Sequence, residues 1–237
     1  ADPDAPTGPP DARQYNCECT FANPDKFSIP ACGQAMMLAV RYQDGILMQQ
    51  ADVDRFYRLV DAVNRAEPKT TSAFPNRQYA GSELQIFSNY GPIVSAWTQG
   101  NLATGDTLVD DTFLAHAKSV TYTGYLSVSE IHSFRVEFPT LASFVAIDQV
   151  LAQLPETLIG EYEFYDNNTT IYAISLDEPL QLFLRGGWGD CLAGCISTHE
   201  WEATVTNDLQ VSITDLGGDE VPDFPFAEFI SRCPAQQ

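Results

Sequence analysis

The sequence predicts an α+β protein with a mostly antiparallel sheet, strand–helix–strand units and a C-terminal β-hairpin. Two stretches, 52–65 and 141–155, repeat apolar residues at the spacing of one helix face. Shorter stretches alternate apolar and polar residues as half-buried strands do, and these are most frequent after Thr169. We expect an extended arm rich in Pro and Asp over 1–16, then one domain over 17–237 with a subdivision near residue 128.

The first half is predicted to mix strands and helices. The apolar run Met37–Gln43 is typical of a buried strand, and it follows a cysteine-clamped loop over 17–33. The helix 52–65 places Val53, Phe56, Val60 and Val63 on one face, with Asp52 as its cap. A strand over Ser82–Tyr90 and a short helix over roughly 106–117 follow, and another strand succeeds that helix.

The second half begins with the clearest strand–helix–strand unit. It comprises the strand His132–Pro139, the helix Leu141–Pro155 and the strand Gly160–Asn168. Beyond it, "TIYAIS" and "LQLFLR" read as strands. Trp201, Ala203 and Val205 then alternate with polar residues, as do Leu209, Val211 and Ile213 after a turn at 207–208, which predicts a hairpin with one buried face.

Cysteine number and charge point to an exported protein that is secreted, periplasmic or held at a cell surface. An even number of cysteines predicts three disulfides that stabilise the fold, formed by Cys17, Cys19, Cys32, Cys191, Cys195 and Cys233. The first residues lack a signal-peptide pattern and resemble a mature N-terminus or a tail left by a secretion vector. Asn167 and Asn168 match the glycosylation pattern, which applies only in a eukaryotic host.

The charge balance favours some partners over others. The chain has 32 acidic and 12 basic residues, so its net charge of −20 disfavours nucleic acid and anionic membranes. The sequence contains no run of 18 apolar residues, so it does not predict membrane insertion. Basic protein partners or Ca²⁺ fit better, and a calcium-binding turn is one interpretation of the acidic cluster Asp215, Asp219, Glu220 and Asp223; a solvated acidic turn is the other.

The stretch "GGWGDCLAGCISTHEW" allows three interpretations. A zinc site would use Asp190, Cys191, Cys195 and His199, but no second ligand pair follows. A cysteine nucleophile would need a free thiolate beside a base. A Cys191–Cys195 disulfide that closes a tight loop between two strands is favoured, and the chain shows none of the common catalytic signatures.

The pattern Trp188-Gly189-Asp190-Cys191-x3-Cys195, followed by His199-x-Trp201, resembles a motif of exported bacterial proteins with no assigned activity. This resemblance covers roughly the last 55 residues, implies secretion and a β-hairpin, and carries no catalytic residues. The unit 132–166 resembles, by pattern alone, the small α+β fold of protease propeptides and inhibitors.

Three further features are candidates for contact or catalysis. Tyr90 and Trp97, in a Gly- and Pro-bounded loop, and Trp188 are candidates for a contact surface, with burial in the core as the alternative. Glu161 and Glu163, about 6.5–7 Å apart on a strand, can form an acid pair or plain surface charge. His116 and His132 show no partner in the sequence.

We therefore expect an exported, non-catalytic binding or structural component of an extracellular or cell-surface assembly, formed with a protein partner or by self-assembly. The alternatives are a protease inhibitor or propeptide-like module, and a hydrolase that uses acidic residues. No cofactor is expected apart from Ca²⁺.

Overall fold

A computed structural model of the chain describes residues 30–43, 45–73, 80–127, 131–155, 157–160, 169–189 and 195–222. It contains helices and two four-stranded antiparallel sheets, which confirms the α+β class and the antiparallel pairing. Contacts divide the chain into two compact units: unit 1 takes residues 1–38, 53–75 and 166–237, and unit 2 takes residues 39–52 and 76–165. The expected subdivision near 128 does not coincide with this division, because residue 128 falls inside unit 2.

The sheet of unit 1 runs in the order β5-β6-β7-β8, so each strand pairs with its neighbour in sequence. The strands are β5 (Thr170–Ser175), β6 (Leu180–Trp188), β7 (Ser197–Val205) and β8 (Val211–Gly218). These strands confirm the two strands predicted after Thr169 and the hairpin that follows them. Trp201, Ala203 and Val205 are buried, as the alternation predicts.

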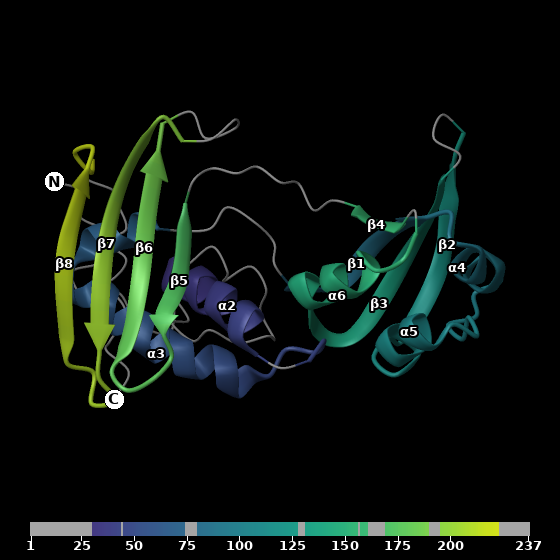
Figure 1. Cartoon of the computed structure of the whole chain (residues 1–237), viewed down its shortest axis with the longest axis horizontal. Helices are drawn as coiled ribbons and strands as arrows, with labels where there is room; N and C mark the ends of the chain where they lie inside the picture. The colour runs from purple at the N-terminus through teal and green to yellow at the C-terminus, as the bar shows by residue number, and fades with distance from the viewer. Residues whose placement is uncertain are drawn as a thin grey trace, which may run out of the picture. The chain divides into compact units, whose positions relative to one another are not determined.

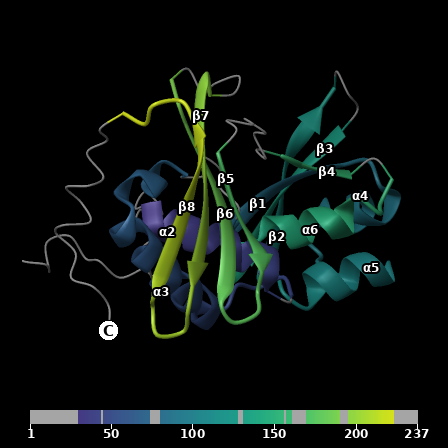
Figure 2. The same ribbon diagram turned by 60° about the vertical axis from the view of Figure 1, so that its left-hand side comes forward.

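Two helices, α2 (Pro30–Tyr42) and α3 (Gln50–Ala66), run along one face of this sheet in both views (Figures 1 and 2). The predicted face of α3 is buried at every position that the periodicity indicates: Val53, Phe56, Val60 and Val63. Within the described ranges, no helix lies on the opposite face of the sheet. We call this opposite side the open face.

The strand expected over Met37–Gln43 is wrong, because residues 37–42 belong to α2. Since α2 starts at Pro30, it also takes in the end of the loop expected over 17–33. A short run that is apolar on every side is compatible with either a buried strand or a buried helix, and its length decides between them. The cap assigned to Asp52 is wrong as well, since α3 already starts at Gln50.

A buried polar network anchors the short 3-10 helix η2 (Pro68–Ser72) to both helices of unit 1. The side-chain amide of Gln34 donates to the Thr70 carbonyl oxygen at 2.9 Å, and Asn64 donates to Gln34 Oε1 at 2.9 Å. The Thr70 hydroxyl lies 2.8 Å from Asn64 Oδ1. Because all three side chains are buried and hydrogen-bonded, the network gives η2 a defined position over one end of the sheet.

The sheet of unit 2 has the order β2-β3-β1-β4. Its strands are β1 (Ala80–Ser88), β2 (Ser119–Leu126), β3 (Ile131–Ser143) and β4 (Thr157–Gly160), and its helices are α4 (Gly91–Trp97), α5 (Thr107–Val109) with the π-helical turn η3 (Asp110–Leu114), and α6 (Phe144–Leu151). The strands expected at 82–90, after 117 and at 132–139 are confirmed. The helix expected at 106–117 is present but shorter, as α5 followed by η3. The helix expected at 141–155 is also shorter, because Leu141 still belongs to β3 and α6 begins at Phe144.

The helices of unit 2 contribute to one apolar core with its strands. Trp97 contacts Phe113 and Phe134 edge-on, at ring-centroid distances of 5.1 and 5.5 Å. Ile147 and Leu151 of α6 belong to the same cluster. In the part of the chain that the structure describes, no helix combines the length and apolarity that crossing a membrane requires.

Candidate functional site

The polar cluster around His199 lies in unit 1, at the end of the sheet where η2 sits. His199 on β7 is paired with Gly186 on β6 and with Gly218 on β8. Both glycines allow a close approach: a Cβ on Gly186 would lie 2.0 Å from Ser72 Oγ of η2, and a Cβ on Gly218 would lie 2.4 Å from the Thr198 carbonyl oxygen. The backbone around His199 is therefore closely packed on both sides.

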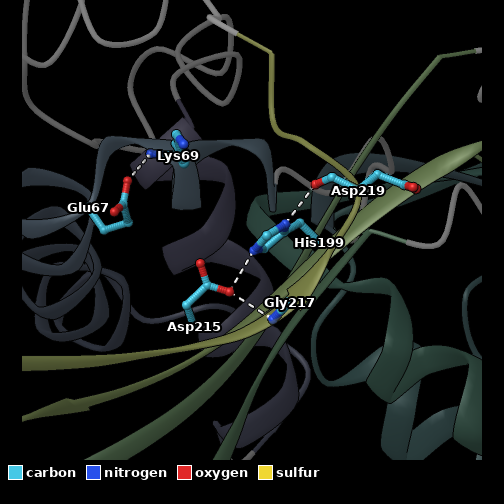
Figure 3. Close-up of polar contacts among 6 residues, drawn as sticks. All are labelled: Glu67, Lys69, His199, Asp215, Gly217 and Asp219. Carbon is cyan, nitrogen blue, oxygen red and sulfur yellow. Dashed lines mark hydrogen bonds and ion pairs between the residues drawn. The ribbon is translucent and has the colours of Figure 1, made fainter.

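Both ring nitrogens of His199 have hydrogen-bond partners from β8 and the residues after it (Figure 3). Nδ1 lies 2.7 Å from the Asp219 carbonyl oxygen, and Nε2 lies 2.8 Å from Asp215 Oδ1. The ring also packs on the buried Trp201, with centroids 4.7 Å apart. His199 is thus held by one partner at each nitrogen and by an aromatic ring.

The partners of the ring affect the ionisation of Asp215. The hydrogen bond from His199, followed by that from the Gly217 N–H at 2.7 Å, lowers the pKa of Asp215, and the charge of Lys69 acts in the same direction. Asp215 Oδ1 thus receives two hydrogen bonds, one from the His199 ring and one from the backbone.

Further hydrogen bonds near His199 and Asp215 join the start of β7 to the residues that follow β8. Asp219 accepts from the Thr198 N–H through Oδ2 at 3.1 Å and returns its own N–H to the Thr198 carbonyl oxygen at 2.8 Å. On η2, Glu67 accepts from the backbone N–H of Lys69 at 3.1 Å (Figure 3). The charged groups of this site mainly hold β7, β8 and η2 in place.

This arrangement limits the chemistry of the site. A general base or a metal ligand needs a ring nitrogen that is free to meet a substrate or a metal ion, and both nitrogens of His199 already have hydrogen-bond partners within the protein. The hydroxyl of Ser72 donates to the Lys69 carbonyl oxygen at 2.7 Å. The described geometry therefore contains no activated nucleophile at this end of the sheet.

Neither predicted metal site is assembled in the described ranges, where no three His, Cys, Asp or Glu side chains group around one point. Of the zinc set, Asp190 and Cys191 lie outside the described residues. Of the calcium set, Asp223 lies outside them, while the carboxylates of Asp215 and Asp219 accept the hydrogen bonds given above and Glu220 is exposed. The calcium site stays a prediction.

The two cysteines that the structure describes, Cys32 and Cys195, are both disulfide-bonded. The other four, Cys17, Cys19, Cys191 and Cys233, lie outside the described residues. The number of disulfides and the Cys191–Cys195 pairing therefore stay predictions.

Part of the predicted contact surface is wrong. Trp97 is 0% exposed, because its segment is the helix α4 instead of a loop and turns the indole into the core of unit 2. Tyr90 is partly buried against the same core and donates its hydroxyl to Asp106 at 2.6 Å. Trp188, at the end of β6, is partly buried.

Several candidates fall where the structure gives no description: Glu161, Glu163, Asn167, Asn168 and the arm 1–16. His132, for which the sequence shows no partner, packs between Tyr122 and Tyr125, at centroid distances of 5.9 and 4.9 Å. His116 follows η3 and is partly buried.

Sequence reasoning missed the open face of the β5–β8 sheet as a surface. Tyr172 and Phe183 are cross-strand partners whose rings stack at 4.9 Å, and Glu202 is the next residue in that row. In the adjacent row Arg185 pairs with Glu200, with Nη2 2.5 Å from Oε1, and its guanidinium lies 5.8 Å from the Phe183 ring centroid. The signal was the position of Tyr172 next to the buried Ile171, because neighbouring residues of a strand lie on opposite faces; the register with β6 shifts at Ile174, which is exposed.

No protein-family model, curated protein or solved structure matches the chain. The described fold and site define an α+β protein built on two antiparallel sheets.

Proposed function

We propose that this chain is an exported, non-catalytic binding component that contacts a protein partner through the open face of the β5–β8 sheet. The observation that carries the proposal is the apolar and aromatic group Tyr172, Ile174 and Phe183 on a sheet face that no helix of the described residues covers. Tyr172 and Ile174 are 37% and 49% exposed. Aromatic residues and arginine are enriched in protein interfaces, and Arg185 borders this group.

The charges around the group indicate the chemistry of the partner. Arg185 is already paired with Glu200, whereas Glu202 is exposed beside Phe183. In a chain with a net charge of −20, such a surface fits a partner with apolar side chains next to a lysine or arginine.

Two observations support the non-catalytic and exported parts of the proposal. Both nitrogens of His199 already have hydrogen-bond partners within the protein, which favours a structural role for this cluster. The disulfide-bonded Cys32 and Cys195 fit an oxidising compartment and a disulfide-stabilised fold. No observation on the described residues favours a protease inhibitor or a hydrolase.

Photo-crosslinking with competition tests the proposal. A crosslinking residue replaces the exposed Gln181 on the open face, and the full chain is incubated with the extracellular protein of its source. We expect one discrete adduct that excess unlabelled wild-type chain abolishes. The double variant Tyr172→Thr/Ile174→Thr should compete at least about tenfold less well, since it removes two exposed apolar contacts.

The matched control is Leu216→Thr, which removes an exposed apolar side chain from the other edge strand of the same sheet, β8. It should compete like the wild type. Equal competition by the double variant, or the absence of a competable adduct, would contradict the proposal.

A further inference from the structure

The edge strand β2 differs from the rest of the chain in its charge. β2 reads "SVTYTGYL" and contains no Asp, Glu, Lys, Arg or Pro, although 44 of the 237 residues are charged (32 acidic and 12 basic). Its residues are mainly β-branched or aromatic, which favours strand pairing. An edge strand without charge or proline lacks the common devices that prevent pairing with another chain.

The outer edge of β2 is open within the described ranges. Among the residues that the structure describes, its only strand partner is β3, and no backbone hydrogen bond from outside the sheet reaches residues 119–126. Tyr122, Tyr125 and Leu126 are 39%, 50% and 49% exposed. The strand thus presents unpaired backbone groups beside exposed apolar side chains.

An aromatic row connects this edge to the core of unit 2. Phe134 is buried, and Tyr122 packs on it at a centroid distance of 5.7 Å. His132 extends the row to Tyr125, and its Nδ1 is buried without a hydrogen-bond partner among the described residues. The apolar surface therefore continues from the core to the outer edge, where no described strand pairs with β2.

The other three edges are less suited to pairing. β4 has only four residues. β8 carries Asp215, and its register with β7 shifts between Glu200 and Trp201 of β7. On β5, Ile171 and Ala173 make interactions in addition to their pairing with β6. β2 is the long, uncharged edge that remains.

We propose that two copies of this chain associate through β2, by antiparallel pairing of β2 with β2 of the second copy about a two-fold axis. A second copy carries the same charge of −20, so most of its surface is repelled, whereas β2 meets β2 without opposing carboxylates. The two four-stranded sheets then form one continuous sheet, and Tyr122 and Tyr125 of both copies lie near each other.

The local geometry predicts a weak dimer that salt strengthens. The register shift between Tyr122 and Gly124 interrupts β2, so the new ladder consists of short pieces. Because the two copies repel each other over most of their surface, higher ionic strength should favour association. A contact driven by opposite charges would show the reverse.

Sedimentation velocity of the full chain, over a range of concentrations at low and high salt, tests the proposal. We expect a monomer–dimer equilibrium that shifts toward dimer as salt rises. Thr121→Glu, at an exposed site of β2 opposite Arg135, should raise the dimer dissociation constant by about tenfold or more, because the symmetric pairing brings two new carboxylates together.

The control is Thr214→Glu, the same charge change at an exposed site of β8 in unit 1, which should leave the dissociation constant within about twofold of the wild type. Circular dichroism and thermal unfolding verify that both variants fold. A wild-type chain that stays monomeric at high salt, or a Thr121→Glu variant that dimerises like the wild type, would overturn the proposal. A crosslinker at position 121 that captures a different protein would also overturn it, in favour of an extended segment of that partner.

Dimerisation does not depend on the open face, so the two proposals fail separately. Tyr172→Thr/Ile174→Thr should leave the monomer–dimer equilibrium unchanged, since Tyr172 and Ile174 lie in unit 1 and β2 lies in unit 2.

Discussion

At the scale of single residues, Asp215 links the ends of β7 and β8 through one carboxylate oxygen. Oδ1 accepts from His199 Nε2 and from the Gly217 N–H, and these bonds lower the pKa of the carboxyl group. A carboxyl group whose pKa is lower in the folded chain than in the unfolded chain stabilises the fold above its unfolded pKa of about 3.9. That contribution is lost as the pH falls through the folded pKa.

We therefore expect Asp215→Asn to lower the melting temperature between about pH 5 and pH 6, because asparagine keeps the size of the side chain and loses its charge. The difference from the wild type should shrink and vanish as the pH falls below the folded pKa of Asp215. Thermal unfolding followed by circular dichroism at stepwise pH measures both effects.

Glu220→Gln, an equal charge change at an exposed neighbour, serves as the control and should show little dependence on pH. A difference between Asp215→Asn and the wild type that stays constant down to the lowest pH would show that the charge of Asp215 has no role.

The sequence could not predict this pairing from His199 itself. Asp215 lies 16 positions away, and the two meet only because the register of β7 and β8 brings them together across an irregularity at Glu200/Trp201. A one-residue slip in register would place Asp215 on the other face of the sheet.

At the scale of elements, the packing of η2 on β6 requires a residue without a side chain. Gly186 lies under η2, where an added Cβ would meet Ser72 Oγ at 2.0 Å and Ser72 Cβ at 2.9 Å. The buried Gln34–Asn64–Thr70 network holds η2 in place, so η2 cannot simply move away.

Gly186→Ala should therefore lower the free energy of unfolding by about 1–3 kcal/mol, the usual cost of overpacking. Urea denaturation measures it. In a Ser72→Gly background the same substitution should cost less, because the Oγ and Cβ atoms that it meets are gone.

Gly91→Ala is the matched control, since a Cβ there meets no atom within 4 Å. An equal cost of Gly186→Ala with and without Ser72→Gly would mean that the contact with η2 is not what excludes a side chain.

At the scale of the whole molecule, the two units have separate apolar cores. Phe113 belongs to the core of unit 2, with Trp97 and Phe134, while Leu182 is buried in the sheet of unit 1. Local stability can differ between such regions, and hydrogen exchange reports it segment by segment.

We expect Phe113→Ala, which removes about 3–5 kcal/mol of core packing, to raise amide exchange in β1 to β3 and to leave β6 and β7 unchanged. Leu182→Ala should do the reverse, at a cost of about 2–5 kcal/mol. Hydrogen–deuterium exchange with mass spectrometry gives both results. Equal acceleration of all strands by either variant would show that the two units unfold as one.

The sequence by itself determined the α+β class, the buried face of α3 and the C-terminal hairpin, because the periodicities of apolar residues in helices and strands are local properties. Tertiary structure decided that the run at Met37 is helical, that Trp97 faces a core and that His199 meets Asp215. These outcomes depend on which distant segments cover a residue, and a local apolar run or a single histidine carries no information about its partners.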